Sequence, residues 1–158
     1  MKCTILGCDG SFPGANGACS SYLVEAGGEM LLLDLGCGAL PRLMAIAMPE
    51  KLTAIVLSHW HNDHVSDLLA LKYYLLLHDL TLPLYAPPAP PPFQKLLGDG
   101  QFLHHRLEAC QVLGGFTLRA HPVEHPMPAF ALRVERDGKA LVYTGDVAGG
   151  EGLAAYCR

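Results

Sequence analysis

The chain has 158 residues, a length that suits one domain, and we predict that residues 1–158 form a single domain. Its net charge of −4 and its 11 lysines and arginines, scattered singly, argue against a nucleic-acid-binding protein. Hydrophobic residues make up 51% of the chain and charged residues only 16%, so we expect a partner to cover part of the apolar surface and predict a homo-oligomer.

The sequence also bears on location. The N-terminal stretch MKCTILGCDG has no extended apolar run before a small-residue cleavage site, so it does not resemble a secretory signal. Asp34 and Arg42 interrupt the longest apolar candidate for a membrane helix. We therefore predict a cytoplasmic protein that does not span a membrane. The six cysteines form no C-x-x-C pair, and we interpret most of them as reduced thiols in the core.

The N-terminal part of the chain is predicted to be a small meander of strands. Residues 2–8, 20–26 and 30–34 are strand-like runs, separated by the glycine-rich loop DGSFPGANGA and the turn GGE. Residues 39–48 carry apolar side chains at helical spacing, which predicts a helix that ends at Pro49.

The middle of the chain delivers a histidine-rich segment from a strand. Residues 53–58 (TAIVLS) are apolar and β-branched, which predicts a buried strand, and ligand sites in α/β proteins favour the C-terminal ends of such strands. Leucines at helical spacing predict a helix over 65–78, and a short strand is expected at 82–86. The segment PPAPPPF (87–93) predicts a rigid surface connector, because prolines disfavour helix and internal strand alike.

A second strand-rich stretch completes the chain, with strand-like runs at residues 107–113, 116–125, 129–136 and 139–146. The dipeptide Asp137-Gly138 predicts a tight hairpin turn between the last two runs. The mixture of strands and helices places the chain in the α/β class.

The segment SHWHNDHVSD (58–67) indicates a metal site. His59 and His61 are two residues apart, so on an extended segment both imidazoles point to the same side and can hold one ion. Asp63 and His64 fall at the turn into the next helix, where they can face a second ion. A polar loop of surface histidines is the alternative for any single histidine, but it does not explain this spacing of four ligand-type residues.

This motif resembles the signature of the metallo-β-lactamase-fold hydrolases, and other features match in chain order. They are DLGCG with Asp34, a histidine after a later strand, and Asp146 in YTGD. The resemblance implies an α/β fold, the N-terminal part of a metallo-β-lactamase-like αββα sandwich with its second half incomplete. It also implies a first zinc held by His59, His61 and His125, a second held by Asp63 and His64, a bridging Asp146, and an Asp34 that orients the histidine motif.

The third histidine of the first zinc requires a choice, because HPVEH offers both His121 and His125. His125 fits the resemblance better, since it directly precedes the strand PAFALRVER and leaves the family's usual gap before Asp146. His121 is expected to be a neighbouring core or pocket residue. The remaining histidines lack matching context and are interpreted as structural or exposed; they are His78, His104 and His105.

Within the superfamily the chain is most similar to the ribonuclease Z-like phosphodiesterase branch. The similarity runs from TILGCDGSFPGANGACSSYLVE through LSHWHNDHVSDLLAL to HPMPAFALRVERDGKALVYTGD. It implies a metal-dependent phosphodiesterase in which two ions hold a bridging hydroxide and Asp63 is both a ligand and a catalytic residue. Zinc is favoured, while manganese and iron suit the same ligands. The branch's Gly-Leu-Pro continuation and basic arm are missing here, which favours a small phosphodiester substrate over tRNA.

The resemblance also predicts a gap in the site. The family continues after its bridging aspartate to a histidine near the leaving group and a last histidine on the second metal. Here VAGGEGLAAYCR follows Asp146 and contains no histidine. We therefore expect a domain that is incomplete at its C-terminus and a second metal that lacks one protein ligand. A non-catalytic, metal-binding fragment or interaction subunit of the same fold is the alternative function.

Overall fold

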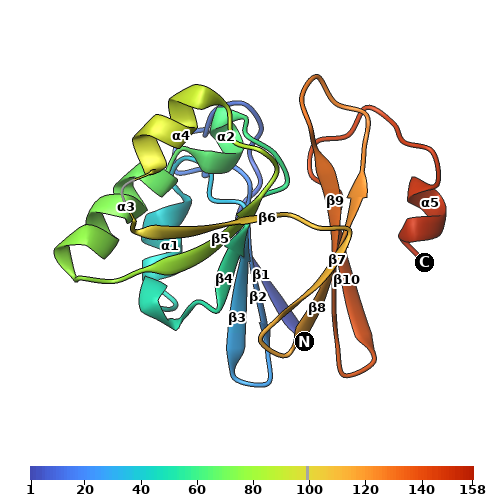
Figure 1. Ribbon diagram of the computed structural model, residues 1–158, viewed down its shortest axis with the longest axis horizontal. Helices are drawn as coiled ribbons and strands as arrows, with labels where there is room; N and C mark the ends of the chain where they lie inside the picture. Colours follow the sequence, from blue (N-terminus) through green and yellow to red (C-terminus); the bar gives the residue numbers. More distant parts are fainter. Residues whose placement is uncertain (99) are drawn as a thin grey trace.

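The fold consists of two sheets packed face to face, with helices on the outer side of the first sheet (Figure 1). The computed structural model describes residues 1–98 and 100–158. The first sheet, in spatial order, contains β1 (Lys2–Gly7), β2 (Ser21–Ala26), β3 (Glu29–Leu33), β4 (Ala54–Val56), β5 (Leu82–Ala86) and β6 (Phe102–Arg106). The second sheet, in the order β10-β9-β8-β7, contains β7 (Cys110–Leu113), β8 (Phe116–Pro122), β9 (Phe130–Arg136) and β10 (Lys139–Tyr143).

The helices lie mainly on one side of this pair of sheets (Figure 1). The outer face of the first sheet is covered by α1 (Ala39–Met44), α3 (Leu68–Leu77) and α4 (Pro91–Leu97). A 3₁₀ turn, η1 (Pro49–Lys51), precedes β4, the short helix α2 (Asn62–Val65) follows it, and α5 (Leu153–Tyr156) lies beyond the second sheet. Among the described residues, every helix is too short or too polar to cross a membrane.

Strand direction brings the chemically interesting segments to one edge. The pairs β3–β4, β4–β5 and β5–β6 are parallel, whereas β1, β2 and β3 form an antiparallel meander as predicted. Parallel strands expose their C-terminal ends at a common edge of the sheet. The residues that follow β3, β4, β5 and β6 therefore lie near one another.

Two apolar layers hold the fold together. Leu32, Ile55 and Leu71 pack between the first sheet and its helices, while Leu31 and Phe116 pack between the two sheets. Successive side chains of a strand point to opposite faces, so β3 and β4 contribute to both layers and read as continuous apolar runs. The layered α/β arrangement confirms the predicted fold class.

Part of the apolar surface that composition led us to expect lies on the helical side, while Phe12 and Val112 are exposed elsewhere. Tyr73 and Leu77 of α3 are 67% and 79% exposed, and Leu76 and Leu96 are also exposed. The outer face of the second sheet is polar by comparison, with Arg119 on β8 among its residues. Self-association of the chain stays a prediction.

One prediction about the proline-rich segment is wrong. Residues 91–93 begin a helix, α4, rather than completing a rigid connector. Pro91 and Pro92 occupy its first turn, where the backbone N–H groups have no partner within the helix, so the missing donors cost little there. Pro90 occupies the N-cap position before them, with φ of −58° and ψ of 149°. The connector is thus confined to the residues between β5 and α4.

Other boundaries also differ from the predictions. The helix predicted over 39–48 ends at Met44. The one predicted over 65–78 begins later, as α3 at Leu68, and Val65 belongs instead to the separate helix α2. Neither β6 nor α5 was predicted. Most cysteines are exposed, so their assignment to the core is wrong; the exposed ones are Cys3, Cys8, Cys110 and Cys157.

Candidate metal centre

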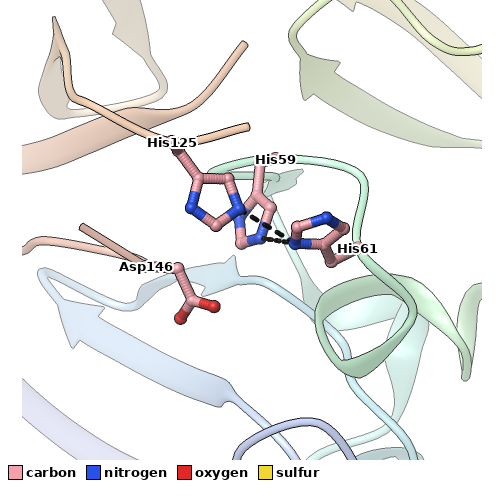
Figure 2. A group of neighbouring side chains, drawn as sticks. All are labelled: His59, His61, His125 and Asp146. Carbon is pink, nitrogen blue, oxygen red and sulfur yellow. Dashed lines mark hydrogen bonds between the residues drawn. The ribbon is translucent and has the colours of Figure 1, made fainter. Parts of the chain in front are cut away.

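Separate segments of the chain deliver ligand-type side chains to the edge where β4 ends. His59 and His61 follow β4 in extended backbone, with His61 at the N-cap of α2, so the start of that helix places Asp63 and His64 beside them. His125 lies in the loop between β8 and β9, and Asp146 lies after β10. Loops of the second sheet therefore supply the remaining two residues of the cluster (Figure 2).

The first group contains three imidazoles and one carboxylate. His61 Nδ1 lies 3.1 Å from His59 Nε2 and 2.9 Å from His125 Nε2, and the three rings face one another in Figure 2. Asp146 completes the group, with all the ligand atoms within 4.8 Å of one another. Ligand atoms around a tetrahedral zinc with bonds of about 2.1 Å are about 3.4 Å apart, so this spacing suits an ion.

The second group consists of Asp63, His64 and the same Asp146. His64 Nε2 lies 3.7 Å from Asp63 Oδ2 and 3.3 Å from Asp146 Oδ1. This nitrogen is buried and has no hydrogen-bond partner within the described residues. Since Asp146 belongs to both groups, it is placed to bridge them.

Asp34 fixes the orientation of the histidine segment through contacts to Ser58 and to the His64 nitrogen that faces away from the cluster. Its buried carboxylate accepts hydrogen bonds of 2.7 Å from the Ser58 backbone N–H, the Ser58 hydroxyl and the Tyr143 hydroxyl, and lies 2.7 Å from His64 Nδ1. Asp34 adopts a left-handed backbone conformation with φ of 55°, which is uncommon outside glycine. The contacts in the structure match the orienting role that the resemblance implied.

These hydrogen bonds determine which ring nitrogens face the cluster. His64 Nδ1 donates its hydrogen to Asp34, so in the neutral ring the lone pair lies on Nε2 and points at Asp63 and Asp146. The Ser58 hydroxyl donates to Asp34 and can accept from His59 Nδ1, 3.0 Å away, which turns the lone pair of His59 Nε2 inward as well. Lone pairs and carboxylates that converge in this way fit a cation between them.

The ionisation of the histidines reflects this field. Burial, followed by the charge of nearby His64, lowers the pKa of His59 to about 4, so His59 is neutral at physiological pH. At His64, burial acts to lower the pKa, but the hydrogen bond to Asp34 and the charges of Asp34 and Asp146 outweigh it and raise the pKa. The carboxylates thus favour positive charge at His64 Nε2, which a proton or a metal ion can supply.

Sequence comparisons identify the family of the chain. The profile described as "Metallo-beta-lactamase superfamily" matches residues 14–154. The chain therefore belongs to the metallo-beta-lactamase superfamily. A "Probable metallo-hydrolase YhfI" of Bacillus subtilis (strain 168) is 37% identical, covering 92% of this chain and 64% of that protein. A "Ribonuclease Z" of Mycobacterium avium (strain 104) is 30% identical, covering 87% of this chain and 48% of that protein.

Solved structures of the metallo-beta-lactamase superfamily match the fold. The crystal structure of the metallo-beta-lactamase fold protein YhfI from Bacillus subtilis superposes with a TM-score of 0.91 at 32% identity, covering 98% of this chain and 65% of that one. Human tRNase Z, short form, gives a TM-score of 0.82 at 21% identity, covering 99% of this chain and 74% of that one. At this identity the match establishes a shared fold and nothing more. The chain spans about 64% of the length of its Bacillus subtilis relative.

The structure brings together the residues predicted as ligands of this superfamily site and separates the others from it. Of the two histidines in HPVEH, His125 is in the cluster, whereas His121 lies near the Glu151 carbonyl oxygen and stacks on Tyr156. His104 and His105 are exposed on β6.

Sequence reasoning missed a contact from the glycine-rich loop. The backbone N–H of Ser11 donates to Asp63 Oδ2 over 2.7 Å, and Ser11 itself has a positive φ of 58°. Partial burial acts to raise the pKa of Asp63, but the Ser11 hydrogen bond and the nearby charge of His64 together outweigh it and lower that pKa. Loop residues 9–17 thus hold the Asp63 carboxylate ionised and in place.

Tyr143 is a second contact that sequence reasoning missed. It ends β10, and its ring packs against that of Tyr22 at a tilt of 44° with the centroids 4.7 Å apart. Its hydroxyl donates to Asp34, so it connects the second sheet to the residue that orients the histidines. Tyr143→Phe is expected to lower the free energy of unfolding by about 1–2 kcal/mol, because a buried carboxylate loses one donor. Urea unfolding measures the change, with Tyr22→Phe as the control; equal stability of Tyr143→Phe and wild type would contradict the role.

Proposed function

We propose that this chain carries the metal-binding part of a metal-dependent hydrolase that cleaves phosphodiesters with a dinuclear site. The observation that carries the proposal is the pair of ligand groups sharing Asp146. His59, His61, His125 and Asp146 would hold one ion, and Asp63, His64 and Asp146 a second. Three imidazoles with one carboxylate favour zinc, while manganese and iron suit the same donors.

The residues of the chain divide the work of this reaction. Metal ions held by these residues would lower the pKa of water, so that hydroxide would be available near neutral pH, and would stabilise negative charge on the phosphoryl oxygens. Asp63, held by the Ser11 N–H, would position the attacking oxygen as well as bind metal. Asp34 would keep His64 Nδ1 protonated and its Nε2 free for the ion.

A small phosphodiester is the proposed substrate. Membership of the superfamily and the similarity to a ribonuclease Z support phosphodiester chemistry. The net charge of −4 and the scattered basic residues disfavour a long polyanion such as tRNA, because its binding depends on many cationic contacts.

The second candidate function is a non-catalytic metal-binding fragment or interaction subunit. It is favoured by the unequal size of the two ligand groups, since the first offers four residues and the second three among those that the structure describes. A second ion with only three protein ligands would be held more weakly than the first.

Elemental analysis of metal content tests the proposal. We expect about two ions per 158-residue chain in protein purified without chelator, and we expect EDTA to remove both them and the hydrolysis of bis-p-nitrophenyl phosphate. Intact mass confirms the chain length of the sample. One ion with no turnover would support the non-catalytic function, and absence of metal would reject both.

A further inference from the structure

A cavity lies between α4 and β6, separate from the metal cluster. Its volume is about 380 Å³, within the range of small-molecule sites, and its lining includes Trp60, Ala86, Pro87, Ala89 and Arg106. Neither of the two ligand groups contributes a residue to it. The cavity follows the C-terminal ends of β5 and β6, the edge at which α/β proteins bind ligands.

The apolar wall of the cavity is built in advance. The Trp60 indole N–H donates to the Pro87 carbonyl oxygen over 2.9 Å, and its ring lies 5.2 Å from that of Phe93 in α4. Trp60 is only 3% exposed, so these contacts hold the ring and the connector before α4 in a defined position. Ala86 and Pro87 are also buried, so they and Trp60 form a floor of fixed shape, while Pro88 and Ala89 are the more accessible apolar residues of the lining.

The rim of the cavity carries positive charge. Arg106 ends β6 in an exposed position, and it has no ion pair with any residue in the described part of the chain. His105, which also lines the cavity, stacks on Tyr85 at 4.6 Å. The described lining residues include no carboxylate. Arg106 therefore gives the rim a positive charge, although the chain as a whole has a net charge of −4.

We propose that this cavity binds a small organic anion, with its apolar body against Trp60 and Pro87 and its acid group at Arg106. A guanidinium binds carboxylates and phosphates through paired N–H donors, so Arg106 could bind a ligand that carries either group. Trp60 lies between His59 and His61 in the chain, and the ligand would therefore contact the residue that joins two members of the metal cluster. The site needs no metal, so its test is independent of the proposed hydrolysis.

Fluorescence of the chain's only tryptophan provides the test, with 1-anilinonaphthalene-8-sulfonate as the probe. We expect saturable quenching of Trp60 with sensitised dye emission, in metal-loaded and EDTA-treated protein alike. Arg106→Gln should raise the dissociation constant of the dye about tenfold or more, since a charged hydrogen bond is lost. Lys95→Gln is the matched control, because Lys95 lines a different cavity between α3 and α4, and it should leave the signal unchanged.

Competition then separates the contributions of charge and apolar body. Phenyl phosphate and benzoate should displace the dye, and their relative strengths distinguish phosphate from carboxylate ligands. Inorganic phosphate and phenol, which each lack one half of the ligand, should displace it poorly. The proposal is overturned if quenching is not saturable, if Arg106→Gln binds the dye like wild type, or if Lys95→Gln removes the signal. Thermal melts of both variants confirm that they are folded.

Discussion

Asp63→Ala is expected to abolish hydrolysis of bis-p-nitrophenyl phosphate while the strands remain formed. The substitution removes one of three ligand residues from the second group and the carboxylate proposed to position the attacking oxygen. Asp63 lies in α2, outside both apolar layers, so the core does not depend on it. Turnover and far-ultraviolet circular dichroism, measured on the same samples, test the two halves of the expectation.

The loop contact of Asp63 requires a second variant. Asp63 Oδ2 accepts the Ser11 N–H, so alanine also releases loop residues 9–17. Asp63→Asn keeps an acceptor oxygen for Ser11 but loses the negative charge, and it should be inactive although the loop is retained. Asn62→Ala, one residue away on the exposed side, should keep wild-type turnover. Activity retained in Asp63→Ala would remove Asp63 from the mechanism, whereas loss of activity in Asn62→Ala would indicate damage to α2.

The parts of the site that could be predicted are those that depend on local spacing. His59 and His61 point to one side because they are two apart in extended backbone, and Asp63 and His64 follow from the start of a helix. His125 and Asp146 needed the family resemblance, since their approach to the motif depends on how the second sheet packs on the first. The strands were predicted well for a similar reason, because buried apolar runs set their positions locally.

The two missed contacts of the site share a physical cause, which is that each joins residues distant in sequence. Ser11 reaches Asp63 across 52 residues, and Tyr143 reaches Asp34 across 109, so neither bond has a local signal. The helix α4 has a local cause for its absence from the prediction. Proline breaks the interior of a helix, but Pro91 and Pro92 lie in the first turn, where it is tolerated. The strand β6, with the sequence FLHHR, lacks the apolar pattern of a strand and forms by pairing with β5.

Asp34→Ala is expected to destabilise the fold by roughly 3–5 kcal/mol, the cost of removing one partner from a buried charged network. Ser58, His64 and Tyr143 would each keep a buried donor without its acceptor. For a chain of this length the melting temperature should fall by about 10 °C, measured by calorimetry on metal-free protein. A fall in melting temperature of less than about 2 °C would contradict the central role of Asp34.

Asp34→Asn separates the charge of this residue from its shape and backbone. Asparagine tolerates the left-handed conformation and keeps one acceptor oxygen, so the loss of stability should be smaller than in Asp34→Ala. The neutral amide is a weaker acceptor for the Nδ1 hydrogen of His64 than the carboxylate. The affinity of the second group for metal should therefore fall by about tenfold to a hundredfold. Stable protein with less than wild-type metal content would show that Asp34 orients the ligand beyond supporting the fold. Full metal content in Asp34→Asn would assign it a purely structural role.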